Sequence, residues 1–105
     1  MRETVGPEIG LMIDANNAWD AKTALRFARM AELYDPYWFE EPVHADDYRG
    51  GALLFSALDM PIASGENEYT RWGARDLIES QAADIIQVDP TTCGGISEWL
   101  KIAAM

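Results

Sequence analysis

Short apolar runs and longer segments of helical periodicity alternate along the chain. The four runs lie at 10–13, 37–39, 61–63 and 85–88, and they are mostly apolar at every position. Such runs are typical of strands that are covered on both faces. The first segment between them carries an apolar stripe at helical spacing, formed by Ala21, Ala24, Leu25, Ala28 and Ala31. With further helices expected at 46–58, 70–81 and 95–105, the pattern predicts an α/β architecture of four βα units.

An acidic residue follows each predicted strand. These residues are Asp14, Glu40, Glu66 and Asp89. In a parallel sheet or barrel the carboxyl ends of the strands meet at one edge, where such folds place their active sites. Convergent carboxylates repel one another unless a cation neutralises them, and oxygen ligands favour a hard ion, first Mg²⁺ and then Mn²⁺. The spacing therefore predicts a divalent metal site at this edge.

A purely structural interpretation of these acids is also open. An acid that follows a strand is often the N-cap or a first-turn residue of the next helix. Asp20 and Asp46 already stand at the starts of two predicted helices, so that Asp14 and Glu40 are less needed for capping. Glu40 and Glu41 are adjacent, and only one of them can point inward because successive strand residues face opposite ways.

The strand ends resemble a known family. The matching sequence motifs are Ile13-Asp14-Ala15-Asn16, Trp38-Phe39-Glu40-Glu41-Pro42, Ser64-Gly65-Glu66-Asn67-Glu68 and Gln87-Val88-Asp89 followed by Cys93-Gly94-Gly95-Ile96. In this order and spacing they resemble the mandelate racemase/muconate lactonizing enzyme family of the enolase superfamily. The resemblance implies a partial TIM barrel that carries strands three to six. It also implies that residues 1–105 are a fragment of the C-terminal metal-binding barrel domain, without the capping domain.

The same resemblance assigns roles to the residues at the strand ends. It implies that Asp14, Glu40 and Glu66 bind Mg²⁺, that Asn16 contacts substrate, and that Asp89 orients a histidine general base. That histidine and the Lys-x-Lys pair of the family have no counterpart in this sequence.

Two other polar residues near these strand ends are candidates for substrate binding. His44, the only histidine, lies in the loop after Pro42, on the active-site side but on the wrong strand for the Asp89 partnership. It is either a substrate contact or a solvated loop residue. Glu68, close to Glu66 in the sequence, is a further candidate for a polar contact with substrate.

The family chemistry is removal of the proton α to a carboxylate, with Mg²⁺ stabilising the resulting enediolate. Residues 65–73 look most like acid-sugar dehydratases of the rhamnonate type, so the resemblance implies a sugar acid or other carboxylate as substrate. A racemase or epimerase of the same family is the alternative. A non-catalytic half-barrel binding module is another, and because the base is missing we expect the isolated chain to be inactive.

Composition and charge limit the classes of partner that the chain can bind. The chain has 18 acidic and 8 basic side chains, a net charge of -10, which disfavours nucleic acid as a partner. No apolar run approaches the roughly 20 residues of a membrane span, and we expect a soluble cytoplasmic protein. Cys93 is the single cysteine and is expected to be a small buried residue. The first and last strands of a partial barrel are open edges, which predicts self-association.

Overall fold

Four parallel strands form one sheet in the computed structural model, which describes residues 1–105. The strands are β1 (Leu11–Asp14), β2 (Pro36–Glu40), β3 (Ile62–Ser64) and β4 (Ile85–Ile86). Their order in the sheet is β1-β2-β3-β4, and each neighbouring pair is parallel. Strand order that follows chain order is the result of successive βα units turning the same way. The predicted α/β class and the partial barrel of four βα units are confirmed.

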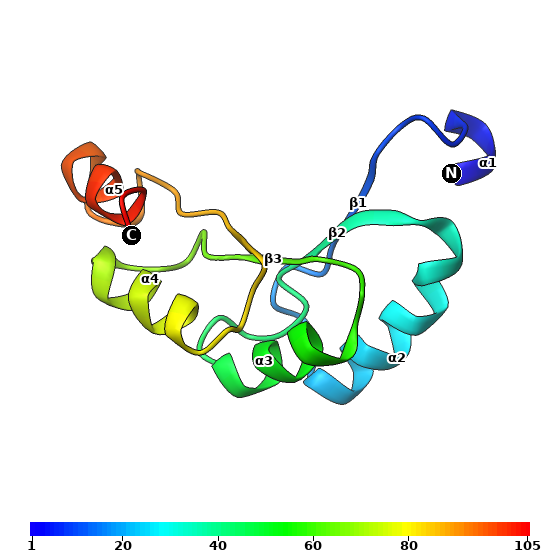
Figure 1. Ribbon diagram of the computed structural model, residues 1–105, viewed down its shortest axis with the longest axis horizontal. Coiled ribbons are helices and arrows are strands. Elements are labelled where there is room, and N and C mark those ends of the chain that lie inside the picture. Colours follow the sequence, from blue (N-terminus) through cyan, green and yellow to red (C-terminus); the bar gives the residue numbers. More distant parts are fainter.

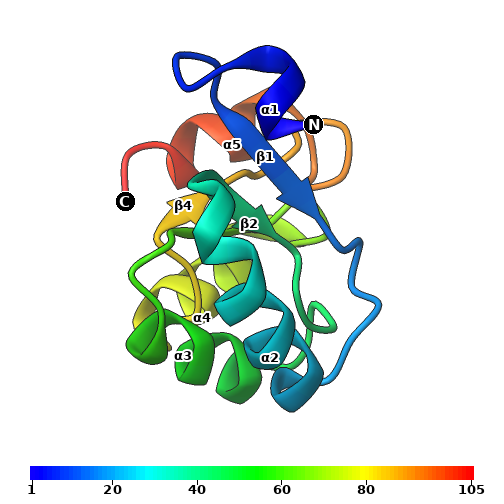
Figure 2. The same ribbon diagram turned by 90° about the vertical axis from the view of Figure 1, so that its right-hand side faces the viewer.

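Helices cover one face of this sheet. α2 (Ala21–Ala31), α3 (Tyr48–Ala57) and α4 (Thr70–Glu79) lie side by side beneath the strands (Figure 1). The short α1 (Arg2–Val5) and α5 (Ile96–Ile102) lie toward opposite ends of the longest axis, which measures 42 Å. Figure 2 shows the same helical layer from the side of α1 and β1. No helix combines the length and the apolar character that a membrane span requires.

The element boundaries differ from the sequence prediction in ways that local contacts explain. The helix predicted to start at 46 begins at Tyr48, because Asp47 rather than Asp46 accepts the backbone N–H of Gly50, at 2.9 Å. Asp20 caps α2 as predicted, accepting the N–H of Thr23 at 2.9 Å. The last strand and the last two helices are shorter than predicted. The structure also adds α1 and a 3₁₀ turn at Glu32–Tyr34 that the apolar pattern did not indicate.

The hydrophobic core lies between the sheet and α2 and α3. Phe39 of β2 is fully buried, and its ring centroid lies 5.9 Å from that of Trp19 and 5.6 Å from that of Phe27. The predicted apolar stripe of α2 faces this core, with Ala24 and Ala28 fully buried. Small alanines let α2 approach the strands closely, so that the aromatic rings fill the remaining space.

The other face of the sheet is uncovered by helices. Met12, in the middle of β1, is 56% exposed, whereas its neighbour Ile13 packs against the core. The expectation that the strands are covered on both faces is therefore wrong for β1, because all three long helices lie on one side (Figure 1). Trp38 is the cross-strand partner of Met12 and lies on the same open face.

A smaller cluster joins α4 to α5. It contains Ala74, Ile102 and the fully buried Cys93, as predicted for the cysteine. Trp72 of α4 lies on the surface. Its side chain is 54% exposed, and the guanidinium groups of Arg71 and Arg75 lie 4.8 and 5.2 Å from its ring. These cation–π contacts stabilise the aromatic ring on the surface.

Candidate functional site

Asp14 and Glu40 are direct neighbours across two strands. They are the last residues of β1 and β2, and their Cα atoms are register partners in the parallel pairing. Glu66 follows β3 two residues after Ser64, in the next segment along the same edge. The backbone thus brings the three predicted metal ligands to the carboxyl ends of neighbouring strands. Asp89 follows β4 at the same edge.

The carboxylates themselves are not gathered around one point. No three His, Cys, Asp or Glu side chains form a group that could hold a metal ion as they stand. Asp14 Oδ1 accepts the backbone N–H of Asn16 at 2.7 Å, and Glu40 Oε2 accepts the indole N–H of Trp38 at 3.0 Å. Carboxylate oxygens are the donors that a hard divalent cation prefers, and the strand ends bring three carboxylates to one edge. Binding one would require the side chains to turn toward a common position.

The adjacent Glu41 takes the opposite direction from Glu40. Its side chain is only 2% exposed and lies between two loops rather than on the open face. Asn17 Nδ2 donates to Glu41 Oε2 at 2.6 Å, and Asn67 Nδ2 donates to Glu41 Oε1 at 2.7 Å. The structure therefore shows which member of the Glu40–Glu41 pair points inward. The Glu40 carboxylate faces the open side with Trp38, and the Glu41 carboxylate is held inside by two amides.

This environment shifts the pKa of the Glu41 carboxyl. Burial raises the pKa of the Glu41 carboxyl, the hydrogen bond from Asn67 opposes the rise, and the nearby charges of Glu66 and Asp14 add to it. The two amides that hold Glu41 come from Asn17 and Asn67, which lie close in the sequence to Asp14 and Glu66. A buried acid in this position was missed as a site residue; its signal was the unusual Glu-Glu pair before Pro42.

The backbone of Glu41 also joins neighbouring segments. Its N–H donates to the carbonyl of Ala63 at 2.9 Å, and its carbonyl accepts the N–H of Asn17 at 2.9 Å. Glu41 and Asn17 both adopt left-handed backbone conformations, with φ of 41° and 61°. Such conformations cost free energy for residues other than glycine and persist where the surroundings fix them. The buried Oδ1 of Asn17 has no hydrogen-bond partner.

The remaining predicted site residues have no contact that marks a role in catalysis. Asn16 is exposed beside Asp14, and His44 has 72% of its side chain exposed, with Nδ1 accepting the N–H of Asp46 at 3.3 Å. Asp89 Oδ1 accepts the N–H of Thr91 at 2.6 Å and its hydroxyl at 2.7 Å, which lowers the pKa of Asp89. His44 and Asp89 make no hydrogen bond to each other. Their substrate and base-orienting roles stay predictions.

Glu68 has a packing environment that the sequence did not indicate. The side chain is 7% exposed, and the hydroxyl of Tyr48 lies 3.1 and 3.2 Å from its two carboxylate oxygens. Burial raises the pKa of Glu68, and burial followed by the Glu68 charge raises the pKa of Tyr48 to about 12. This pair joins α3 to the segment before α4. The predicted substrate contact of Glu68 stays a prediction.

Comparison of the sequence with known protein families identifies the family of this chain. The family described as "Enolase C-terminal domain-like" matches residues 1–105, the whole chain. The chain belongs to this family. The match confirms the resemblance to the enolase superfamily that the strand-end motifs indicated. It also agrees with the partial barrel of four βα units.

Curated relatives in the enolase superfamily are acid-sugar dehydratases. The chain is 45% identical over 102 residues to L-talarate/galactarate dehydratase of Salmonella typhimurium, covering 97% of this chain and 26% of that enzyme. It is also 45% identical over 107 residues to L-rhamnonate dehydratase of Saccharopolyspora erythraea, covering 100% of this chain and 27% of the relative. The chain therefore spans about a quarter of the length of these relatives.

Solved structures share the same arrangement of elements. L-talarate dehydratase of a Polaromonas species, complexed with Mg and L-glucarate, matches with a TM-score of 0.94 and 42% identity, over 98% of this chain and 29% of that one. A racemase of Streptomyces coelicolor with bound magnesium matches with a TM-score of 0.95 and 33% identity, over 98% of this chain and 29% of that one. Magnesium is thus a ligand found in the family.

Proposed function

We propose that this chain supplies the metal-binding edge of a magnesium-dependent acid-sugar dehydratase. The observation that supports this most directly is the register that sets Asp14 opposite Glu40, with Glu66 following the next strand at the same edge. The dehydratase relatives support this class of reaction, since two of them match nearly the full chain at 45% identity. The substrate class is then a sugar acid whose carboxylate approaches this edge.

The chemistry proposed is loss of water from a hydroxy acid. In an α,β-dihydroxy acid a general base removes the proton α to the carboxylate, and the β-hydroxyl takes up a proton and leaves as water. The enol that remains tautomerises to an α-keto acid. Bound Mg²⁺ would supply positive charge to the carboxylate oxygens, where negative charge develops. The role of Asp14, Glu40 and Glu66 is to hold that charge in place. Asp89 would orient a histidine base, and Asn16 would bind substrate oxygens.

The test uses the full-length protein that contains these residues. Mg²⁺ binding is measured by isothermal titration calorimetry, and L-talarate, galactarate and L-rhamnonate are assayed for formation of an α-keto acid. We expect Mg²⁺ binding and turnover of a sugar acid, and loss of both in Asp14→Asn. The control is Glu98→Gln, which removes a charge outside the strand-end edge. A protein that binds no Mg²⁺ would refute the proposal, and one that binds Mg²⁺ without any turnover would favour the non-catalytic binding module.

Racemisation or epimerisation is the second candidate, favoured by the similarity to the Streptomyces coelicolor racemase. Both reactions begin with removal of the same α proton, and they differ in whether a hydroxyl leaves or the proton returns on the other face. Incubation in D₂O separates them. A racemase or epimerase incorporates deuterium at the α carbon without forming a keto acid, whereas a dehydratase forms the keto acid with consumption of substrate.

A further inference from the structure

We propose that Glu41 is a positioning residue for the candidate metal site. Its buried carboxylate holds the loop after β1 and the loop after β3 against the end of β2. This inference rests on the proposed function, because it takes Asp14, Glu40 and Glu66 as the ligand set. It concerns a side chain that itself points away from the open face on which Glu40 lies.

The first argument is the geometry of the two hydrogen bonds. A carboxylate only accepts hydrogen bonds, and here each oxygen receives one from a different side-chain amide, at 2.6 and 2.7 Å. Hydrogen bonds to an ionised acceptor are stronger than those between neutral groups. The two donors, Asn17 and Asn67, are 50 residues apart in the sequence, so the contact fixes two segments that the chain does not join locally.

The second argument is where those segments carry their acids. Asn67 directly follows Glu66, Asn17 lies three positions after Asp14, and Glu41 directly follows Glu40. One buried side chain, next to Glu40 in the chain, therefore hydrogen-bonds to side chains from the two segments that carry Asp14 and Glu66. The backbone bonds of Glu41 to Ala63 and Asn17 reinforce the same connections.

The third argument is the free-energy cost of burying the Glu41 carboxylate. The chain carries a net charge of -10, and Glu41 is buried without any cationic partner. Burying a carboxylate is unfavourable unless hydrogen bonds compensate, and Glu41 also holds a left-handed backbone conformation. Packing alone would be served better by an apolar side chain. A costly acid at the junction of three ligand-bearing segments is explained by the need to set their relative positions.

The experiment compares Glu41→Gln with Glu98→Gln in the full-length protein. Both variants replace a carboxylate by an amide of similar shape, but Glu98 hydrogen-bonds to α4 and α5, outside the strand-end edge. In Glu41→Gln one side-chain oxygen becomes a donor that faces the donor of an asparagine, so one hydrogen bond is lost or an amide must rotate. We expect the dissociation constant for Mg²⁺ to rise about 10-fold or more in Glu41→Gln and to stay unchanged in Glu98→Gln.

A second measurement is made without metal. Side-chain amide hydrogen exchange of Asn17 and Asn67, followed by nuclear magnetic resonance, should be slow in the unmodified protein and faster in Glu41→Gln. Faster exchange with an unchanged Mg²⁺ affinity would show that the contact only stabilises loops, and it would overturn the positioning role. An equal loss of Mg²⁺ affinity in Glu98→Gln would overturn it as well. Absence of Mg²⁺ binding in the unmodified protein is the separate result that removes the proposed function.

Discussion

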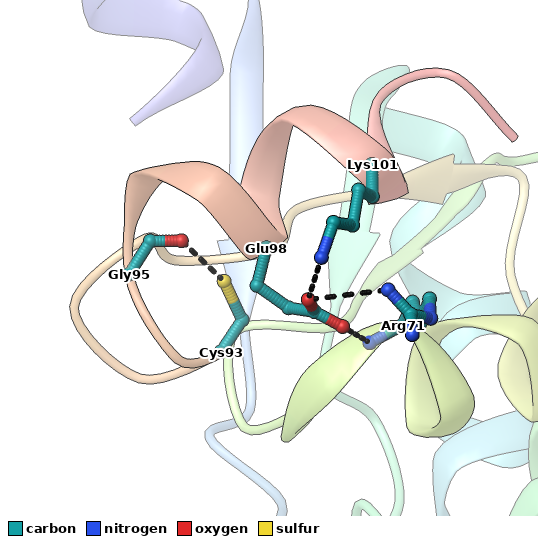
Figure 3. Close-up of polar contacts among 5 residues, drawn as sticks. All are labelled: Arg71, Cys93, Gly95, Glu98 and Lys101. Carbon is teal, nitrogen blue, oxygen red and sulfur yellow. Dashed lines mark hydrogen bonds and ion pairs between the residues drawn. The ribbon is translucent and has the colours of Figure 1, made fainter.

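The carboxylate of Glu98 caps a helix to which it does not belong. Glu98 lies on α5, and its Oε1 accepts the backbone N–H of Arg71, the second residue of α4, at 3.1 Å (Figure 3). Tyr69, at the N-cap position of α4, makes no side-chain capping bond. The N–H of Thr70 instead donates to the carbonyl of Cys93 at 3.0 Å. Two N–H groups of the first turn of α4 are thus satisfied by the segment around α5.

Replacing Glu98 by alanine should therefore destabilise α4 as well as α5. Glu98→Ala leaves the Arg71 N–H without its acceptor and removes the ion pairs with the Arg71 guanidinium and with Lys101, at 3.4 and 3.1 Å. Glu98→Gln keeps a side-chain oxygen that can still accept the N–H. We expect a lower thermal midpoint in Glu98→Ala and a smaller fall in Glu98→Gln, measured by circular dichroism. Equal midpoints in all three proteins would contradict the capping role.

The same carboxylate should make stability depend on pH. The hydrogen bond from the Arg71 backbone, followed by that from Lys101, lowers the pKa of Glu98 below its usual value of 4.5. The folded state therefore binds this proton less tightly than the unfolded state. The stabilisation is present above about pH 4.5 and is lost as the pH falls through the lower folded-state pKa. The free energy of unfolding is measured in urea at pH values from about 3 to about 6. It should fall more steeply on acidification in the unmodified protein than in Glu98→Gln.

The Tyr48–Glu68 pair gives a test of buried hydrogen bonding. Tyr48→Phe removes the only hydrogen-bond donor to the nearly buried Glu68 carboxylate. Leaving such a group unpaired costs about 1–3 kcal/mol. The double variant Tyr48→Phe/Glu68→Leu removes both partners and should recover part of that loss. Urea denaturation of the two single variants and the double variant measures the coupling, and strictly additive effects would argue against the pair.

Gly51 should not tolerate a methyl group although it lies within α3. A Cβ at this position would lie 2.8 Å from the carbonyl oxygen of Ala82 and 2.9 Å from its Cβ. Alanine gains up to about 1 kcal/mol in helix propensity, but overpacking costs about 1–3 kcal/mol, so we expect net destabilisation. Gly10→Ala is the control, since its Cβ would meet Tyr37 at an ordinary 3.8 Å. Thermal unfolding of the two variants compares them directly.

The 105-residue chain on its own should self-associate through its sheet edges. β1 and β4 each have one unpaired side, and an apolar groove of about 470 Å³ beside β4 is lined by Ile86, Val88 and Trp99 among others. Unprotected apolar edges pair with other chains. Light scattering after size exclusion should show a mass that rises with concentration, and Met12→Lys, which places a charge on exposed β1, should reduce it. A monomer at every concentration would contradict this expectation.

Periodicity predicted most of the fold because each signal was local. Asp20 and the alanine stripe of α2 could be placed from spacing alone, and the four strand runs gave the correct order of βα units. The open face was not predicted correctly, because a continuous apolar run shows that side chains avoid water but not which element covers them. Met12 is apolar and yet exposed, since nothing among residues 1–105 covers that face.

The site was predictable in position but not in side-chain arrangement. The strand-end pattern placed Asp14 and Glu40 at one edge, and the observed register agrees. Which member of the Glu40–Glu41 pair turns inward depends on two amide groups from distant loops, and no local pattern reveals that. The same holds for Glu98, whose partner at Arg71 lies 27 positions earlier.

That separation has a consequence for how the polypeptide acquires its structure as it is synthesised. The residues of α4 are synthesised before Cys93 and Glu98 and leave the ribosome ahead of them, so the first turn of α4 remains incomplete until those later residues have also emerged. β1, α2, β2 and α3 can meanwhile assemble around Phe39, because their contacts lie earlier in the chain. A chain truncated between α4 and α5 and released would present a formed core next to a frayed helix, and proteases or chaperones would act first at that helix.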